Sequence, residues 1–164
     1  MAELERLRPG HAAALLAFEL ENRAYFAATI PGRGDDFFEH FADRHASLLA
    51  EQDAGLGLFH VLVGGDGEVL GRFNLTVIEN GTADLGYRVA GRAAGHGAAT
   101  AAVLEVCRRA AQEYGLHSLH AATASDNLAS QKVLARNGFV PVGETRLSGQ
   151  PGITYLCELT GDHD

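Results

Sequence analysis

The sequence predicts an α/β domain in which helices cover both faces of a mixed, mostly antiparallel sheet of six to seven strands. Its first half contains short apolar runs separated by glycine-rich turns, which favours strands that pair with their neighbours in sequence. Its second half contains two helical patterns that each follow a strand, which favours crossover connections. The length of 164 residues suits one domain, and no linker or repeat divides residues 1–164.

The expected elements follow the order β-α-α-β-β-β-α-β-α-β-β. Strands are recognised by apolar or alternating runs between turn residues, and helices by apolar residues at helical spacing. Asp35 and Asp36 are expected to cap the second helix, after a loop over 25–34 that holds a proline and two glycines. Strands are expected at 4–8, 57–63, 68–78, 83–90, 116–123, 139–144 and 153–159, with a loop at 148–152, and helices at 11–22, 37–52, 98–114 and 128–137.

The chain is acidic, with a formal net charge of −8 at pH 7. Phosphate backbones are bound by clustered lysines and arginines, so we expect no nucleic-acid partner, and an amine substrate fits the charge better. Cys107 and Cys157 lie among apolar residues and are expected to be small core side chains rather than a disulfide or a metal pair. No Cys/His cluster has the spacing of metal ligands, so no metal is expected.

No window of the sequence approaches 18 consecutive apolar residues, and its first residues carry acids instead of the apolar segment of a secretory signal. We therefore expect a cytoplasmic protein without a membrane partner. The sequence leaves open whether the chain forms a homodimer.

The most informative stretch is a glycine-containing turn between the strand at 83–90 and the helix at 98–114. It reads Arg92-x-x-Gly95-x-Gly97. Glycines let backbone N–H groups approach a ligand, and a helix start offers unpaired donors, so this turn predicts a phosphate cradle. A dinucleotide fold would require a third glycine where Thr100 stands, and a P-loop would require a lysine that is missing. A plain helix-entry turn without a ligand is the remaining alternative.

A second motif surrounds the helix at 128–137. Asn127, Ser130 and Leu134 fall at i, i+3 and i+7, on one helix face, and Asn137-Gly138-Phe139 closes the helix. Taken singly, Asn127 is read as an N-cap and Ser130 as a solvated helix serine.

Together, the segments Tyr87-Arg88-Val89, Arg92-x-x-Gly95-x-Gly97-Ala98-Ala99-Thr100, Asn127-x-x-Ser130 and Asn137-Gly138-Phe139 resemble the GNAT superfamily of N-acetyltransferases. The resemblance is strongest to its RimJ/RimL-like branch, which includes acetyltransferases of ribosomal-protein N-termini. It implies a single GNAT-like domain and acetyl-CoA as co-substrate. It also implies acetyl transfer to a primary amine, either a protein or peptide N-terminus or a small molecule.

The resemblance also implies a set of cofactor-binding residues. The strand segment would lie beside the acetyl group and the pantetheine arm, the glycine turn would bind the pyrophosphate, and the second motif would contact the pantetheine. Many GNAT members carry a tyrosine four residues before the closing glycine, where this chain has Leu134. That tyrosine acts as an acid toward the leaving thiolate, and the resemblance implies that Ser130 would interact with the thiolate instead. The cofactor-binding residues implied are Tyr87, Arg88, Val89, Arg92, Gly95, His96, Gly97, Ala98, Ala99, Thr100, Asn127 and Ser130.

The general base is expected on the strand before the glycine turn. Asp84 lies where other GNAT members carry a catalytic glutamate, and Glu144 is the alternative. Among the histidines, His96 is expected to face solvent or phosphate, and His60 and His120 are assigned structural roles in strands. A nonenzymatic acyl-CoA-binding or regulatory module remains the alternative function.

Overall fold

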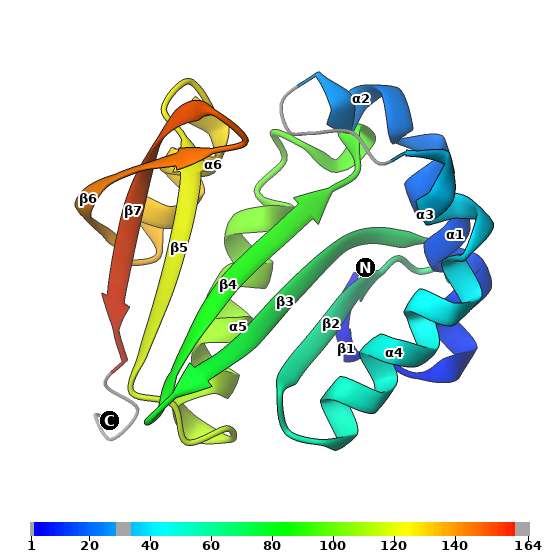
Figure 1. Cartoon of the computed structure of the whole chain (residues 1–164), viewed down its shortest axis with the longest axis horizontal. Coiled ribbons are helices and arrows are strands. Elements are labelled where there is room, and N and C mark those ends of the chain that lie inside the picture. The colour runs from blue at the N-terminus through cyan, green and yellow to red at the C-terminus, as the bar shows by residue number, and fades with distance from the viewer. Residues whose placement is uncertain (1, 29–33, 160–164) are drawn as a thin grey trace. The chain divides into compact units, whose positions relative to one another are not determined.

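The computed structural model describes residues 2–28 and 34–159 and divides the chain into two compact units (Figure 1). Unit 1 comprises Met1–Asn74 and Tyr87–Ala94, and unit 2 comprises Leu75–Gly86 and Gly95–Asp164. The predicted loop at 25–34 lies partly outside the described residues. Within residues 2–28 and 34–159, no helix is both long and apolar enough to cross a membrane.

The seven strands follow the hydrogen-bonded order β1-β2-β3-β4-β5-β7-β6. The pair β4–β5 is parallel, whereas β1–β2, β5–β7 and β6–β7 are antiparallel. The predicted α/β class with a mixed, mostly antiparallel sheet is therefore confirmed. The strands are β1 (Glu3–Arg6), β2 (Gly57–Val63), β3 (Val69–Glu79), β4 (Thr82–Val89), β5 (Ser118–Ala124), β6 (Val140–Leu147) and β7 (Gln150–Glu158).

Unit 1 packs its helices over strands β1 and β2, the first part of β3 and the end of β4. Its helical elements are η1 (Pro9–His11), α1 (Ala12–Glu21), α2 (Arg23–Ala27), α3 (Asp35–Glu39), α4 (Phe41–Asp53) and η2 (Gly91–Ala93). The core of this unit is aliphatic and aromatic, and it consists of Leu7, Leu15, Phe18, Phe26, Phe41, Phe59, Val61, Val69 and Ala90.

Two helical boundaries in unit 1 differ from the prediction. The expected loop begins with the short helix α2, whose Phe26 is buried, so core packing outweighs the nearby turn residues. The helix expected at 37–52 is broken at His40, where the backbone leaves helical geometry with φ −111° and ψ 26°. The His40 ring nitrogen Nδ1 lies 3.1 Å from the carbonyl oxygen of Asp36 at this point. Gly34 is the N-cap of α3, and Asp35 and Asp36 lie in its first turn instead of capping it.

Unit 2 contains α5 (Ala98–Gln112) and α6 (Leu128–Arg136), which Figure 1 shows behind the strands. The apolar face of α5 is buried as predicted, with Val103, Val106 and Ala110 fully covered. Neither cysteine forms a disulfide, and the hydrogen bond with Cys157 together with burial raises the pKa of the Cys107 thiol. This contact places α5 against the face of β7 that carries Cys157.

The hairpin of β6 and β7 is longer than predicted. The expected loop at 148–152 reduces to a tight turn at Ser148 and Gly149, both of which have a positive φ. Two such residues form the turn whose twist matches that of a β-hairpin, so the strands pair up to Leu147 and Gln150.

Candidate active site

The first turn of α5 presents a row of unused backbone donors. Gly95 and Gly97 have φ of +80° and +81°, and a Cβ atom at either would meet nothing within 4 Å. Gly97 is the N-cap and has no side chain to accept a hydrogen bond from the helix. In the part of the chain that is described, the N–H groups of Ala98, Ala99 and Thr100 make no hydrogen bond. Open donors at the positive end of a helix dipole form a binding site for an anion.

Helix α6 lies in the same unit, and an asparagine holds each of its two ends. Asn127 caps the helix, because its Oδ1 accepts a hydrogen bond from Ser130 N at 3.2 Å. At the other end of α6, Asn137 Nδ2 donates to the carbonyl oxygen of Thr100 at 3.2 Å, which ties α6 to the first turn of α5. The capping interpretation of Asn127 is confirmed, and its Nδ2 group makes no hydrogen bond within the described ranges.

The parallel pairing of β4 with β5 is short. It covers three rungs, Thr82 with Ser118, Ala83 with Leu119 and Asp84 with His120. Beyond His120, strand β5 continues to Ala124 and pairs with β7 along the rest of its length. Residues 121–124 of β5 therefore have a strand partner on one side only, among the described residues of unit 2.

The two candidate bases lie on opposite faces of the strands in unit 2. Asp84 is in register with His120, and His120 with Leu156 of β7, so these three side chains share one face. Glu144 of β6 is in register with Ile153, an odd number of residues from Leu156, and therefore lies on the other face. Both carboxylates are exposed.

In unit 1, the end of β4 is held by α1. Arg88 Nη1 lies 3.7 Å from Glu19 Oε1, and its guanidinium stands 4.9 Å from the ring centroid of Phe26. Glu19 is 1% exposed and also accepts a hydrogen bond from Arg72 Nη1 at 2.9 Å. The neighbouring Tyr87 stacks on Phe73, with ring centroids 5.6 Å apart, and Val89 is half-buried.

Sequence reasoning missed Glu19 and Arg72. The signals were an acid among the apolar residues of an Ala- and Leu-rich helix and a single arginine inside an apolar strand. Charged residues are rarely buried unless they are paired, so each of them indicated a partner without identifying it.

Arg92, one of the expected phosphate ligands, is engaged by two acids of unit 1. Its Nη1 lies 3.2 Å from Glu68 Oε2 and its Nε lies 3.7 Å from Glu21 Oε1. Ion pairs between exposed side chains contribute only about 0–1 kcal/mol, so they leave Arg92 available to a phosphate. The turn that carries Arg92 is fixed by Asn22, whose Oδ1 accepts a hydrogen bond from Gly91 N at 3.0 Å.

The three histidines considered in the sequence have different surroundings. His60 is 1% exposed and its Nδ1 lies 3.0 Å from the carbonyl oxygen of Phe73, so its structural role is confirmed. His96 is exposed in the turn before α5. His120 is half-buried, and its ring makes no hydrogen bond or ion pair to the described residues.

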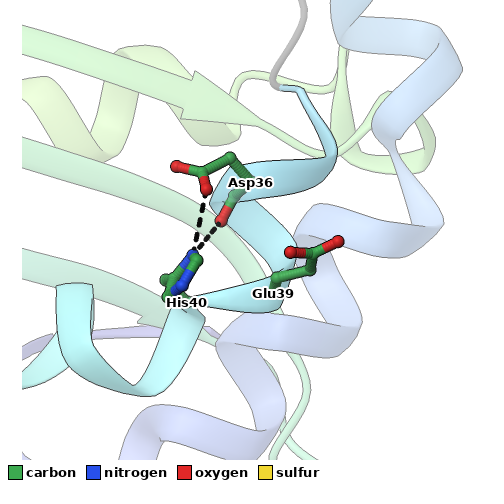
Figure 2. Close-up of side chains that lie close together, drawn as sticks. All are labelled: Asp36, Glu39 and His40. Atoms are coloured by element: carbon green, nitrogen blue, oxygen red, sulfur yellow. Dashed lines mark hydrogen bonds and ion pairs between the residues drawn. The ribbon is translucent and has the colours of Figure 1, made fainter.

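Three exposed side chains on α3 and at its end lie close enough to share a cation: Asp36, Glu39 and His40 (Figure 2). His40 Nδ1 lies 3.1 Å from Asp36 Oδ1 and 3.1 Å from the Asp36 carbonyl oxygen, as the dashed lines in Figure 2 show. Both contacts are local ones at a helix end, and they explain the break between α3 and α4 without a ligand.

A family model described as acetyltransferase (GNAT) domain matches residues 2–140. The chain belongs to the GNAT acetyltransferase family. Among curated proteins, none matches the sequence significantly.

Solved GNAT structures share this fold at low sequence identity. Ribosomal-protein-S5-alanine acetyltransferase from Vibrio fischeri has a TM-score of 0.90 and 22% identity, with 99% of this chain and 96% of that chain covered. Mycobacterium smegmatis RimJ in complex with CoA-disulfide has a TM-score of 0.83 and 24% identity, with 96% and 81% covered. Spermidine N-acetyltransferase from Vibrio cholerae, in complex with CoA and spermine, has a TM-score of 0.75 and 15% identity, with 96% and 95% covered.

One GNAT feature is altered in this chain. Leu134, which stands where many GNAT acetyltransferases carry a tyrosine, is 0% exposed and belongs to the core. Ser130 lies one turn earlier in α6 and is half-buried. The chain therefore offers a hydroxyl in the first turn of α6 instead of a phenol in its second turn.

Proposed function

We propose that this GNAT protein transfers an acetyl group from acetyl-CoA to a primary amine. The observation that carries the proposal is the first turn of α5, where open N–H groups follow two glycines of positive φ. Family membership supports acetyl transfer, and two of the similar structures contain coenzyme A. Acetyl-CoA supplies an activated thioester, which an amine attacks at its carbonyl carbon.

The proposed cofactor contacts come from main-chain and side-chain donors. The amides from Gly95 to Thr100, with His96 beside them, would bind the pyrophosphate. Arg92 stays a prediction as a phosphate ligand. The unused Nδ2 group of Asn127 would donate to the pantetheine. The segment Tyr87–Val89 stays a prediction as the contact for the acetyl end of the cofactor.

The proposed chemistry needs a proton acceptor and a partner for the thiolate. An ammonium group has no lone pair, so the acceptor amine must lose a proton before attack. Asp84 is the proposed carboxylate for this step, directly or through a bridging water. Ser130 would donate a hydrogen bond to the sulfur as charge develops on it. Glu144 stays the alternative base, although its register places it on the face opposite to Asp84.

The acceptor is proposed to be the amine of a protein or peptide N-terminus or of a small molecule. The similar structures include both a ribosomal-protein acetyltransferase and a spermidine acetyltransferase. The net charge of −8 supports a cationic acceptor over an anionic one. The proposed compartment is the cytoplasm, and the proposed organisation is a single domain over residues 1–164.

Two measurements test the function. Thermal unfolding with acetyl-CoA, NAD and ATP should show stabilisation by acetyl-CoA alone, since a ligand that binds the folded state raises its stability. Release of free thiol should follow when acetyl-CoA is mixed with N-terminal peptides or polyamines. Stabilisation without thiol release for any amine would instead identify a nonenzymatic acyl-CoA-binding module. The absence of any stabilisation by acetyl-CoA would overturn both proposals.

A further inference from the structure

The last rung of the β4–β5 ladder brings a carboxylate and an imidazole together. Asp84 and His120 are register partners there, and paired residues on neighbouring strands project from the same face. Neither side chain makes a hydrogen bond or an ion pair in the part of the chain that is described. His120 thus differs from His60, whose ring is hydrogen-bonded in the core.

The surroundings of this pair leave room for a substrate. Gly86, two residues after Asp84 on the same face, is exposed, and a Cβ atom there would meet nothing within 4 Å. On β7 the partner of His120 is Leu156, and the partner of Ser118, two residues before His120, is Glu158. Asp84 of β4 and Glu158 of β7 therefore share the face of His120, as does Glu79 of β3, which lies opposite Thr82 across the turn at Asn80 and Gly81. Asp84 is the nearest of the three in register.

Reference pKa values show whether an imidazole or a carboxylate is the better proton acceptor for an amine. An N-terminal amine has a pKa of about 7.7–8.0, imidazole about 6.5 and an aspartate carboxyl about 3.9. Proton transfer from the ammonium to a carboxylate is therefore opposed by a factor of roughly 10⁴, but transfer to imidazole by a factor of only about 10 to 30. The better-matched base is therefore the histidine.

We infer that His120 accepts the proton of the acceptor ammonium and that Asp84, its register partner on β4, positions the imidazole. This inference rests on the proposed acetyl transfer. The freed amine lone pair forms the C–N bond, and the electrons of the C–S bond leave on sulfur. The second proton of the attacking nitrogen goes to the thiolate, and His120 releases the first proton to solvent. The products are the amide, the free thiol and one proton.

The kinetic test compares His120→Gln with a matched histidine variant, His117→Gln. His117 is exposed, three residues before His120, and outside the proposed site. With a peptide acceptor at pH 7, His120→Gln should lower kcat about 100-fold, the lower range for loss of a general base, and should remove the acidic limb of the pH–rate profile. Its Kd for acetyl-CoA should stay at the parent value. His117→Gln and Glu158→Gln should each change kcat less than about twofold, as expected for surface positions.

The second test asks whether Asp84 acts through His120. Asp84→Asn should lower kcat in the parent protein but should lower it no further in the His120→Gln background, because a positioning residue has no effect once the imidazole is absent. The inference fails if His120→Gln keeps the parent rate and pH profile in a protein that does acetylate amines, or if Asp84→Asn lowers kcat equally with and without His120. A parent protein that acetylates no amine removes the proposed function as well.

Discussion

The polar groups at the end of β4 in unit 1 are bonded to one another, whereas those at the first turns of α5 and α6 in unit 2 keep unused donors. Glu19 holds both Arg72 and Arg88, and Asn22 holds the amide of Gly91. By contrast, the amides of Ala98 to Thr100 have no partner within the described ranges. Buried polar groups need partners for stability, while exposed donors cost little until a ligand uses them. The first region is therefore interpreted as scaffold and the second as binding surface.

The largest expected effect concerns the scaffold. Glu19→Ala should lower the free energy of unfolding by about 3–5 kcal/mol, because it leaves two arginines beside a buried site without their anion. Urea unfolding measures this loss. The control is Glu21→Ala, which removes an exposed acid two residues away, 3.7 Å from Arg92, and should cost less than about 1 kcal/mol. Equal losses in the two variants would contradict the scaffold interpretation.

The next effect concerns catalysis at the first turn of α6. Ser130→Ala should lower kcat roughly 100-fold, with little change in the Kd for acetyl-CoA, because the proposed hydrogen bond strengthens only as the thiolate forms. Ser47→Ala on α4 is the matched exposed helix serine and should leave kcat unchanged. Normal turnover in Ser130→Ala, measured where chemistry limits the rate, would show that Ser130 has no role in the reaction.

A third prediction separates backbone strain from ligand access. Gly97 and Gly55 have φ of +81° and +80°, and both have open space where a Cβ would lie. Valine at either position should cost about 1–2 kcal/mol of stability through left-handed strain. Only Gly97→Val should also weaken acetyl-CoA binding, by tenfold or more, which is about 1.4 kcal/mol. Calorimetric titration measures the Kd for acetyl-CoA of both folded variants. Equal Kd values would contradict the proposal that the first turn of α5 binds the pyrophosphate.

The smallest effect is expected on the exposed side of α5. Hydrogen bonds from Arg108 and Arg109 lower the pKa of Glu105 from 4.5 to about 2. Because the folded-state pKa is depressed, the stabilisation is present above pH 4.5 and is lost as the pH falls toward 2. The carboxylate is partly exposed, so solvent screening keeps the gain below about 1 kcal/mol. Stability curves of the parent and of Glu105→Gln should therefore converge at the acidic end of this range, and parallel curves would contradict the prediction.

Local signals in the sequence predicted most of the fold and the glycine turn before α5. Strand β2 matches its expected range at 57–63, and α6 ends one residue before the predicted boundary, because turn and capping residues lie beside both. Contacts between distant residues were not predictable in this way. Glu19 and Arg72 are 53 residues apart, and periodicity does not specify such a pair. The register of Asp84 with His120 likewise depends on how two strands align, so the sequence assigned His120 a structural role.

The short ladder between β4 and β5 also has a consequence for handling the protein. Among the described residues of unit 2, residues 121–124 of β5 pair with β7 alone, so this stretch resembles the edge of a sheet, which is a template for strands of other molecules. A ligand that stabilises the folded state lowers the population of opened molecules, so preparations without acetyl-CoA are expected to become turbid on storage sooner than preparations that contain it. Light scattering of matched samples over several days would measure this difference in shelf life.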